Sequence, residues 1–152
     1  MSEFYLGENS RKRLDTCHPD IQLVVEEGLK ASQVDFGVAC GHRPVSEQQA
    51  LYAQGRTEPG QIVTYVDGVN KKSDHNYNPS RAVDLYAWVN GKALWSERYL
   101  TYIAGVLTAT AARLYAEGRI SHRWKWGANW DRDGQIVSDH GFVDYPHHAI
   151  VG

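Results

Sequence analysis

Cysteine is scarce in this sequence, with only Cys17 and Cys40 among 152 residues. The two lie far apart and form no C-x-x-C pair, so we expect free thiols in a reducing cytosol rather than a disulfide framework or a thiolate metal site. Long apolar runs are missing too. No stretch has the length of a membrane span, and the first residues lack a basic segment followed by an apolar one. We therefore expect a chain made in the cytoplasm, with no membrane partner.

An excess of basic residues is also absent. The formal net charge is -2, from 16 Lys and Arg against 18 Asp and Glu. A nucleic-acid-binding surface needs clustered Lys and Arg in excess, so we expect no nucleic-acid partner. No internal repeat or low-complexity linker divides the chain, and 42% hydrophobic residues are enough for one core. Length and composition together predict one domain, residues 1–152, acting as a monomer.

Apolar periodicity predicts both helices and strands. Apolar residues recur at helical spacing from Pro19 to Ala31 and from Ser96 to Gly118, and Ser46 with Gln49 indicates the start of a shorter helix. Alternating apolar residues predict strands at 34–38, 61–66, 81–88, 120–126 and 142–148, and Asn90-Gly91 predicts a hairpin turn. This order of elements favours a small α+β domain in which helices flank an antiparallel sheet.

The stretch from Ser73 to Asp84 carries the first two candidate metal ligands. His75 lies in a polar segment with asparagines, serines and a proline, which is typical of a loop. The strand that follows places Val83 and Leu85 on one face and Asp84 on the other. A carboxylate on a strand built for burial costs free energy unless it is paired or bound to a cation. Asp84 therefore needs a partner, and a metal ion shared with His75 would supply one.

The tail of the chain offers a third ligand. A catalytic zinc site takes three protein ligands and leaves a fourth position to water, and His147 is the expected third ligand. Asp144, three residues earlier, could stand beside the metal and take a proton from the attacking water. His148 competes with His147, but neighbouring strand residues point to opposite faces, and the offset from Asp144 favours His147. The remaining histidines are expected as surface or capping residues: His18, His42, His122 and His140.

These residues resemble the zinc peptidases of the D-Ala-D-Ala carboxypeptidase and L-alanyl-D-glutamate endopeptidase group, which includes many phage endolysins. The family pattern is S-x-H-x-x-G-x-A-x-D, followed later by an acidic residue and P-H, and it matches Ser73, His75, Ala82, Asp84, Asp144, Pro146 and His147. The segment from His75 to Asp84 is two residues longer than the family spacing, and the glycine is replaced within 78–80. The extra residues fall in a turn-rich stretch that can bulge outward. The resemblance extends to 18–20, 41–43 and 126–130.

The resemblance implies zinc-dependent hydrolysis of an amide bond in the peptide stem of bacterial peptidoglycan. Zinc would be held by the three candidate ligands, and Asp144 would be the catalytic base. Arg43 and Ser73 would orient the substrate or steady the developing oxyanion. Without the resemblance, Arg43 is more simply a surface arginine in a turn, and only the family's G-x-R motif favours the catalytic role.

Within this family the chain resembles a phage endolysin, made in the host cytoplasm and acting on the cell wall once the membrane has been opened. We expect cleavage between L-alanine and D-glutamate. A D-Ala-D-Ala carboxypeptidase or dipeptidase could use the same zinc site, and a non-catalytic binding domain with a structural zinc is a further alternative. Asp144 argues against the last, because a structural site has no use for a base beside an open coordination position.

The segment from Asn129 to Gly134 suggests a second ion. It matches the first half of an EF-hand loop, with Asn129, Asp131 and Asp133 as oxygen ligands for Ca²⁺. The twelfth position, where a bidentate glutamate belongs, is His140. A tight turn at Asp133-Gly134 is the simpler explanation of the same residues.

Overall fold

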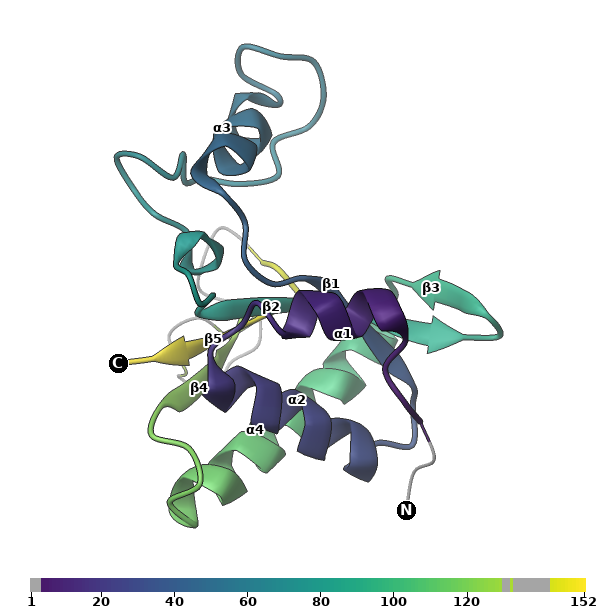
Figure 1. Cartoon of the computed structure of the whole chain (residues 1–152). Helices are drawn as coiled ribbons and strands as arrows, with labels where there is room; N and C mark the ends of the chain where they lie inside the picture. The colour runs from purple at the N-terminus through teal and green to yellow at the C-terminus, as the bar shows by residue number, and fades with distance from the viewer. Residues whose placement is uncertain (1–3, 130–131, 133–142) are drawn as a thin grey trace.

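The computed structural model describes residues 4–129, 132 and 143–152 (Figure 1). Its helices are α1 (Glu8–Leu14), α2 (Pro19–Ala31), α3 (Val45–Ala53) and α4 (Glu97–Ala116), with a 3-10 turn, η1, at Asp74–Asn76. The strands are β1 (Phe36–Cys40), β2 (Ala82–Val89), β3 (Lys92–Leu94), β4 (Arg123–Trp126) and β5 (His147–Val151). They form one antiparallel sheet in the order β1-β2-β5-β4, with β3 paired to β2. The predicted α+β class is confirmed.

One face of the sheet is covered, and the other is the more open one, although the Ser10 hydroxyl of α1 lies 3.4 Å from the Tyr86 hydroxyl there. Val83, Leu85 and Ala87 of β2 are 0% exposed and belong to one core with residues of α2 and α4. Figure 1 shows these two helices together on one side of the sheet. Asp84, which alternates with the buried residues of β2, lies on the other face. Antiparallel sheets commonly have one packed and one solvated face, and here the candidate site lies on the open one.

The segment 45–72 stands away from the sheet as a lobe that begins with α3 (Figure 1). The predicted strand at 61–66 is wrong, because this segment has no neighbouring strand in the part of the chain that is described. Side chains, and not a neighbouring strand, donate hydrogen bonds to its carbonyl groups. Gln48 Nε2 donates to Val66 O at 2.9 Å, and the Arg56 guanidinium donates to Thr64 O at 3.1 Å. The alternating apolar residues face no core, and Val63 is 44% exposed.

The last strand starts later than the sequence predicts. We expected it at 142–148, whereas β5 begins at His147 and ends at Val151. The peptide N–H of His147 donates to Asp144 O at 3.1 Å, which closes a turn that includes Pro146. The proline has no N–H to offer a ladder, so pairing with β2 starts only after it.

The observed helices α1 and α3 also differ from the prediction. Helix α1 was not predicted, because it has only seven residues and buries only Ser10 and Leu14. Helix α3 follows Pro44, and no side chain caps it, so the expected start at Ser46 with a capping box did not form. The hairpin signal is confirmed: Asn90 and Gly91 have φ values of 52° and 75° and join β2 to β3.

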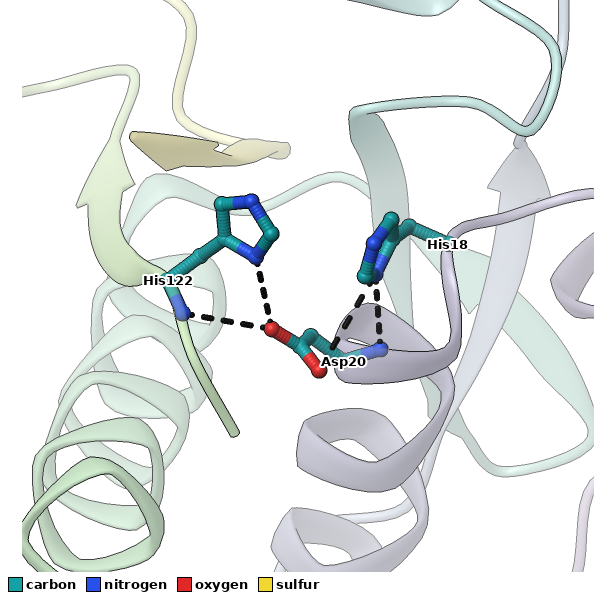
Figure 2. A group of neighbouring side chains, drawn as sticks. All are labelled: His18, Asp20 and His122. Atoms are coloured by element: carbon teal, nitrogen blue, oxygen red, sulfur yellow. Dashed lines mark hydrogen bonds and ion pairs between the residues drawn. The ribbon is translucent and has the colours of Figure 1, made fainter. Parts of the chain in front are cut away.

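A polar cluster joins the start of α2 to the segment before β4 (Figure 2). His18 caps α2, since its Nδ1 accepts from the Asp20 N–H at 3.0 Å. The Asp20 carboxylate lies 2.7 Å from His122 Nδ1 and accepts from the Ser121 N–H at 3.0 Å. The capping role expected of His18 is confirmed, whereas the link to His122, 102 residues away from Asp20, was not predicted.

We expect Asp20→Asn to lower the free energy of unfolding by about 1–3 kcal/mol at neutral pH, because several hydrogen bonds to a charged acceptor are weakened. Burial raises the pKa of Asp20, but the hydrogen bonds from His122 and Ser121 outweigh it and lower the pKa. A carboxylate with a lowered pKa stabilises the fold above its unfolded pKa of about 3.9, and this contribution is lost as the pH falls through the folded pKa. Urea unfolding across acidic pH should therefore show the parent and Asp20→Asn converging below about pH 3.9. A difference that stays constant would contradict the charged role.

Candidate metal centre and active site

Two of the predicted site residues converge on one carboxylate oxygen of a third. His75 Nε2 lies 3.0 Å and His147 Nδ1 lies 3.1 Å from the same oxygen, Oδ1 of Asp84. The two imidazole rings are 5.1 Å apart and roughly perpendicular, at 72°. They come from different elements, η1 and β5, on either side of Asp84 in β2. The structure thus brings together two nitrogen ligands and one oxygen ligand that the sequence separates by 9 and 63 residues.

Strand register decides which of the two adjacent histidines reaches the site. Asp84 pairs with His147, so their side chains share the open face, whereas Val83 pairs with His148 on the covered face. Trp124 Nε1 donates to His148 Nδ1 at 3.2 Å. Burial lowers the pKa of His148 to about 3 and keeps the ring neutral. His148 is therefore a core residue, and His147 is the histidine beside Asp84.

The loop around His75 is built to hold one orientation of its ring. The Ser73 hydroxyl accepts from the His75 N–H at 3.2 Å, and Asn76 Oδ1 accepts from the Ser73 N–H at 2.8 Å, which forms a capping box. His75 Nδ1 lies 2.7 Å from the carbonyl oxygen of Gly41. A proton on Nδ1, donated to this carbonyl, leaves Nε2 turned toward Asp84. Such a backbone partner is the usual way in which a metal-binding imidazole is fixed.

The two additional residues between His75 and Asp84 do bulge outward, as expected. Residues 77–79 are exposed, and the chain returns to the interior at Ser80, whose hydroxyl donates to Ala82 O at 2.7 Å. His42 Nδ1 lies 2.9 Å from Tyr77 O and supports the base of the bulge. The longer loop therefore leaves His75 and Asp84 in contact.

The charges in this cluster stabilise one another. Burial would raise the pKa of Asp84, but the facing His75 and His147 hold it well below the usual range. Burial would lower the pKa of His75, but the Asp84 carboxylate overrides this and raises it to about 10. A metal ion at this centre would compete with the proton for the ring nitrogen, because histidine binds metals in its neutral form.

A glycine brings Asp144 beside this cluster. The Asp144 N–H donates to Gly127 O at 2.9 Å, and the Gly127 N–H donates to His147 O at 2.8 Å. A Cβ at position 127 would overlap the carbonyl oxygen of Asp144, so only glycine permits this close approach. Ligand atoms of Asp84, Asp144 and His147 lie within 4.8 Å of one another. Burial, followed by the negative charge of Asp84, raises the pKa of Asp144.

Arg43 points at the cluster and is not a surface arginine. Its guanidinium lies 3.7 Å from Asp84 Oδ2, and its side chain is 15% exposed. The same guanidinium donates to Gln48 Oε1 at 2.8 Å. Gln48 is 0% exposed and also holds the lobe through Val66 O. The sequence analysis missed Gln48 because a glutamine in a helix shows no pattern that distinguishes it from a surface residue.

Cys40 is a second residue that the sequence analysis placed outside the site. Its sulfur and the ligand atoms of His75 and Asp84 lie within 4.8 Å of one another, a second such group at this centre. The Arg43 guanidinium donates to the sulfur at 3.6 Å. Both cysteines are free, as expected. Its position at the end of β1, the strand directly before Gly41 and Arg43, could have indicated that Cys40 lies near the site. Cys17, by contrast, is buried, and burial raises its pKa to about 12.

A cavity of about 580 Å³ opens over these residues. The sheet side of the cavity is formed by Arg43, His75, Asp84, Asp144 and His147, and the lobe forms the opposite wall. Lys71, Lys72 and Lys125 also line it, together with Ser73. The site therefore combines convergent metal-ligating groups, a neighbouring carboxylate and a cleft large enough for a peptide.

The phage L-alanyl-D-glutamate peptidase model matches residues 1–151 of the chain. The chain belongs to the phage L-alanyl-D-glutamate peptidase family. Its activity is hydrolysis of the bond between L-alanine and D-glutamate in peptidoglycan. The expected family and reaction are confirmed, and this bond is preferred over the D-Ala-D-Ala alternative.

Two curated relatives support this assignment. The L-alanyl-D-glutamate peptidase of Escherichia phage T5 is 24% identical over 150 residues, which cover 97% of this chain and 98% of that protein. The peptidoglycan L-alanyl-D-glutamate endopeptidase CwlK of Bacillus subtilis (strain 168) is 32% identical over 130 residues, which cover 82% of this chain and 68% of that protein. Both alignments include most of this peptidase.

The fold also matches a solved structure. The crystal structure of the Serratia marcescens L-Ala D-Glu endopeptidase ChiX aligns with a TM-score of 0.71 and 23% sequence identity, covering 98% of this chain and 92% of that one. This likeness supports the fold of the peptidase. None of its described helices combines the length and the apolarity that crossing a bilayer requires.

The expected calcium loop falls mostly outside the described residues. Asp131, Asp133 and His140 are not described, and only Asn129 is, with a buried Oδ1 that has no hydrogen-bond partner among the described residues. The calcium site of this peptidase stays a prediction.

Proposed function

We propose that the peptidase is a zinc enzyme whose metal is held by His75, Asp84 and His147. The observation that carries this proposal is the approach of two imidazole nitrogens to one carboxylate oxygen, at 3.0 and 3.1 Å. Two histidines and one carboxylate are a known ligand set of catalytic zinc. The donor types fit the ion, and the Gly41 carbonyl accepts a hydrogen bond from the other ring nitrogen of His75, which fixes the ring as such a ligand needs.

The remaining residues supply the steps that a peptide hydrolase needs. Zinc at this centre would provide Lewis-acid polarisation of a carbonyl and activation of water at neutral pH. Asp144 would accept the proton of the attacking water and return it to the leaving amine. The Arg43 guanidinium faces the same point and would stabilise negative charge that develops on the carbonyl oxygen. Ser73 lines the cavity but has its hydroxyl engaged with the His75 N–H, so we propose that it orients substrate mainly through the His75 loop.

The lysines of the cavity fit the chemistry of the stem peptide. D-glutamate and the residues that follow it carry free carboxylates, and Lys71, Lys72 and Lys125 line the cavity. We propose that the D-glutamate half of the substrate lies against these lysines, where opposite charges attract and fix its direction. Residues 1–152 would act as one domain and as a monomer, without nucleic acid, in a phage protein made in the host cytoplasm.

The non-catalytic alternative has less support. A structural zinc is enclosed by four protein ligands, whereas this cluster opens into a cavity of about 580 Å³ and has an additional carboxylate at its edge. The thiol of Cys40 is the competing third ligand, since its sulfur and the ligand atoms of His75 and Asp84 lie within 4.8 Å of one another. Zinc bound through Cys40 would leave His147 without a ligand role.

Digestion of purified peptidoglycan tests the proposed function. Mass spectrometry of the products should find new peptides with D-glutamate at the amino terminus, and L-alanine retained on the glycan. A chelator should abolish their release, and added zinc should restore it. Release of free D-alanine instead would identify a carboxypeptidase, and release that is indifferent to the chelator would refute the zinc proposal.

A further inference from the structure

A row of aromatic side chains continues from the metal centre along the open face of β2. Alternate residues of a strand share one face, so Tyr86 and Trp88 follow Asp84 along this surface. Trp95, directly after β3, joins them: its ring centroid lies 5.7 Å from that of Tyr86, and the Tyr86 and Trp88 centroids are 6.3 Å apart. We call Tyr86, Trp88 and Trp95 the aromatic row. It lies on the β2–β3 hairpin, which extends outward from the sheet (Figure 1).

The two tryptophans of the aromatic row are open to solvent, whereas Tyr86 is half-buried and its hydroxyl lies 3.4 Å from that of Ser10 in α1. Trp88 is 43% and Trp95 is 52% exposed, although an indole side chain gains free energy by burial. Contiguous exposed rings of this size mark binding surfaces more often than isolated ones do. The row therefore has the character of a surface that a ligand covers.

Polar groups stand beside these rings. A second cavity, of about 390 Å³, is lined by Tyr86 and Trp88 together with Glu8, Asn9 and Asp35. An aromatic face carries partial negative charge and attracts the C–H groups of a ligand. Carboxylate and amide groups at the edge accept and donate hydrogen bonds to hydroxyls. A sugar ring presents both features, because its faces are rich in C–H groups and its edge in hydroxyls.

The aromatic row also lies at the right distance from the metal centre. Consecutive strand residues rise about 3.3 Å, so Tyr86 and Trp88 stand roughly 7 and 13 Å along the strand from Asp84. In peptidoglycan the amino group of L-alanine is joined through a lactyl group to a muramic sugar. One residue spans at most about 3.6 Å, and the lactyl group is of similar length, so the first sugar begins roughly 7 Å from the scissile bond.

We infer that the aromatic row binds the glycan strand of peptidoglycan, on the L-alanine side of the scissile bond. The inference rests on the proposed function, since it takes the metal centre as the place of cleavage. The aromatic row follows Asp84 of the active site along the same strand, β2, and the lysines of the cleft occupy the side proposed for D-glutamate. A substrate that occupies the aromatic row and the cleft would be recognised through its glycan and through its peptide. A free peptide could bind only the cleft.

The first test measures glycan binding without any bond to cut. The probe is a peptide-free oligosaccharide of alternating N-acetylglucosamine and N-acetylmuramic acid, titrated into the zinc-loaded protein by calorimetry. We expect the parent to bind it and the Trp88→Ala/Trp95→Ala variant to bind about tenfold more weakly or not at all. Tyr115→Ala is the matched control, because Tyr115 is 38% exposed on α4 and belongs to no such row. A parent that does not bind the oligosaccharide overturns the inference, whichever stem-peptide bond the enzyme cuts.

The second test compares two substrates. One is a stem peptide attached to a disaccharide, and the other is the same peptide without sugar. The ratio of their kcat/KM values should fall about tenfold in the Trp88→Ala/Trp95→Ala variant and stay unchanged in Tyr115→Ala. Equal losses on both substrates would reveal a structural effect and overturn the inference. Sedimentation that shows a dimer dissociated by the same substitutions, without glycan binding, would assign the aromatic row to self-association instead.

Discussion

The His147→Ala variant is expected to lose both its zinc and its activity. Removal of one of three protein ligands leaves two, and even loss of a group that only hydrogen-bonds to a ligand typically weakens metal affinity by about 10- to 100-fold. We therefore expect more than roughly 100-fold weaker zinc affinity, with activity lost in parallel. His75→Ala and Asp84→Ala should behave alike. Zinc stoichiometry after gel filtration, measured together with circular dichroism, separates loss of metal from loss of fold.

Two control variants distinguish the ligands from their neighbours. His148→Gln preserves an acceptor for Trp124 Nε1 in the core and should keep its zinc. Cys40→Ser removes the competing thiol and should also keep its zinc. Full zinc in His147→Ala, with loss in Cys40→Ser, would show that the thiol is the third ligand.

The Asp144→Asn variant is expected to keep its zinc and to lose turnover by roughly 100-fold or more, since general-base catalysis contributes on this scale. Asparagine has almost the same shape, so the hydrogen bond from the Asp144 N–H to Gly127 O, which uses only backbone atoms, remains. The loss should appear in kcat, measured on a soluble stem-peptide substrate, because the substitution removes a group that acts on the reacting water.

Asp15→Asn is the control for this experiment. Asp15 is an exposed carboxylate at the end of α1 and does not line the cavity. Its replacement should leave turnover close to the parent rate. Equal turnover in Asp144→Asn and the parent would refute the proposed base.

The clustering of the candidate metal ligands was largely predictable because these residues carry a dense local pattern. His75 and Asp84 are nine residues apart, and strand alternation alone places Asp84 opposite the buried Val83 and Leu85. Alternation also separates His147 from His148, although the choice needed the register with β2. Candidate ligands that lie in one strand and its flanking loop can therefore be predicted from the sequence before the fold is known.

Contacts between distant segments were not predictable in the same way. Gln48 supports Arg43 and the lobe at once, and Asp20 joins α2 to His122, but neither polar residue belongs to a local pattern. The expected strand at 61–66 failed for a related reason. Alternation indicates a strand only when a neighbouring strand and a core are present, and the lobe provides neither among its described residues.

Anomalous diffraction at the zinc absorption edge, from crystals of the zinc-loaded protein, tests the central claim most directly. The account predicts one strong peak between His75 Nε2, Asp84 and His147, beside Asp144. A peak at the cluster of His18, Asp20 and His122, whose ligand atoms also lie within 4.8 Å of one another, with none at Asp84, would contradict it. So would a zinc ion bound to Cys40, with His147 turned away.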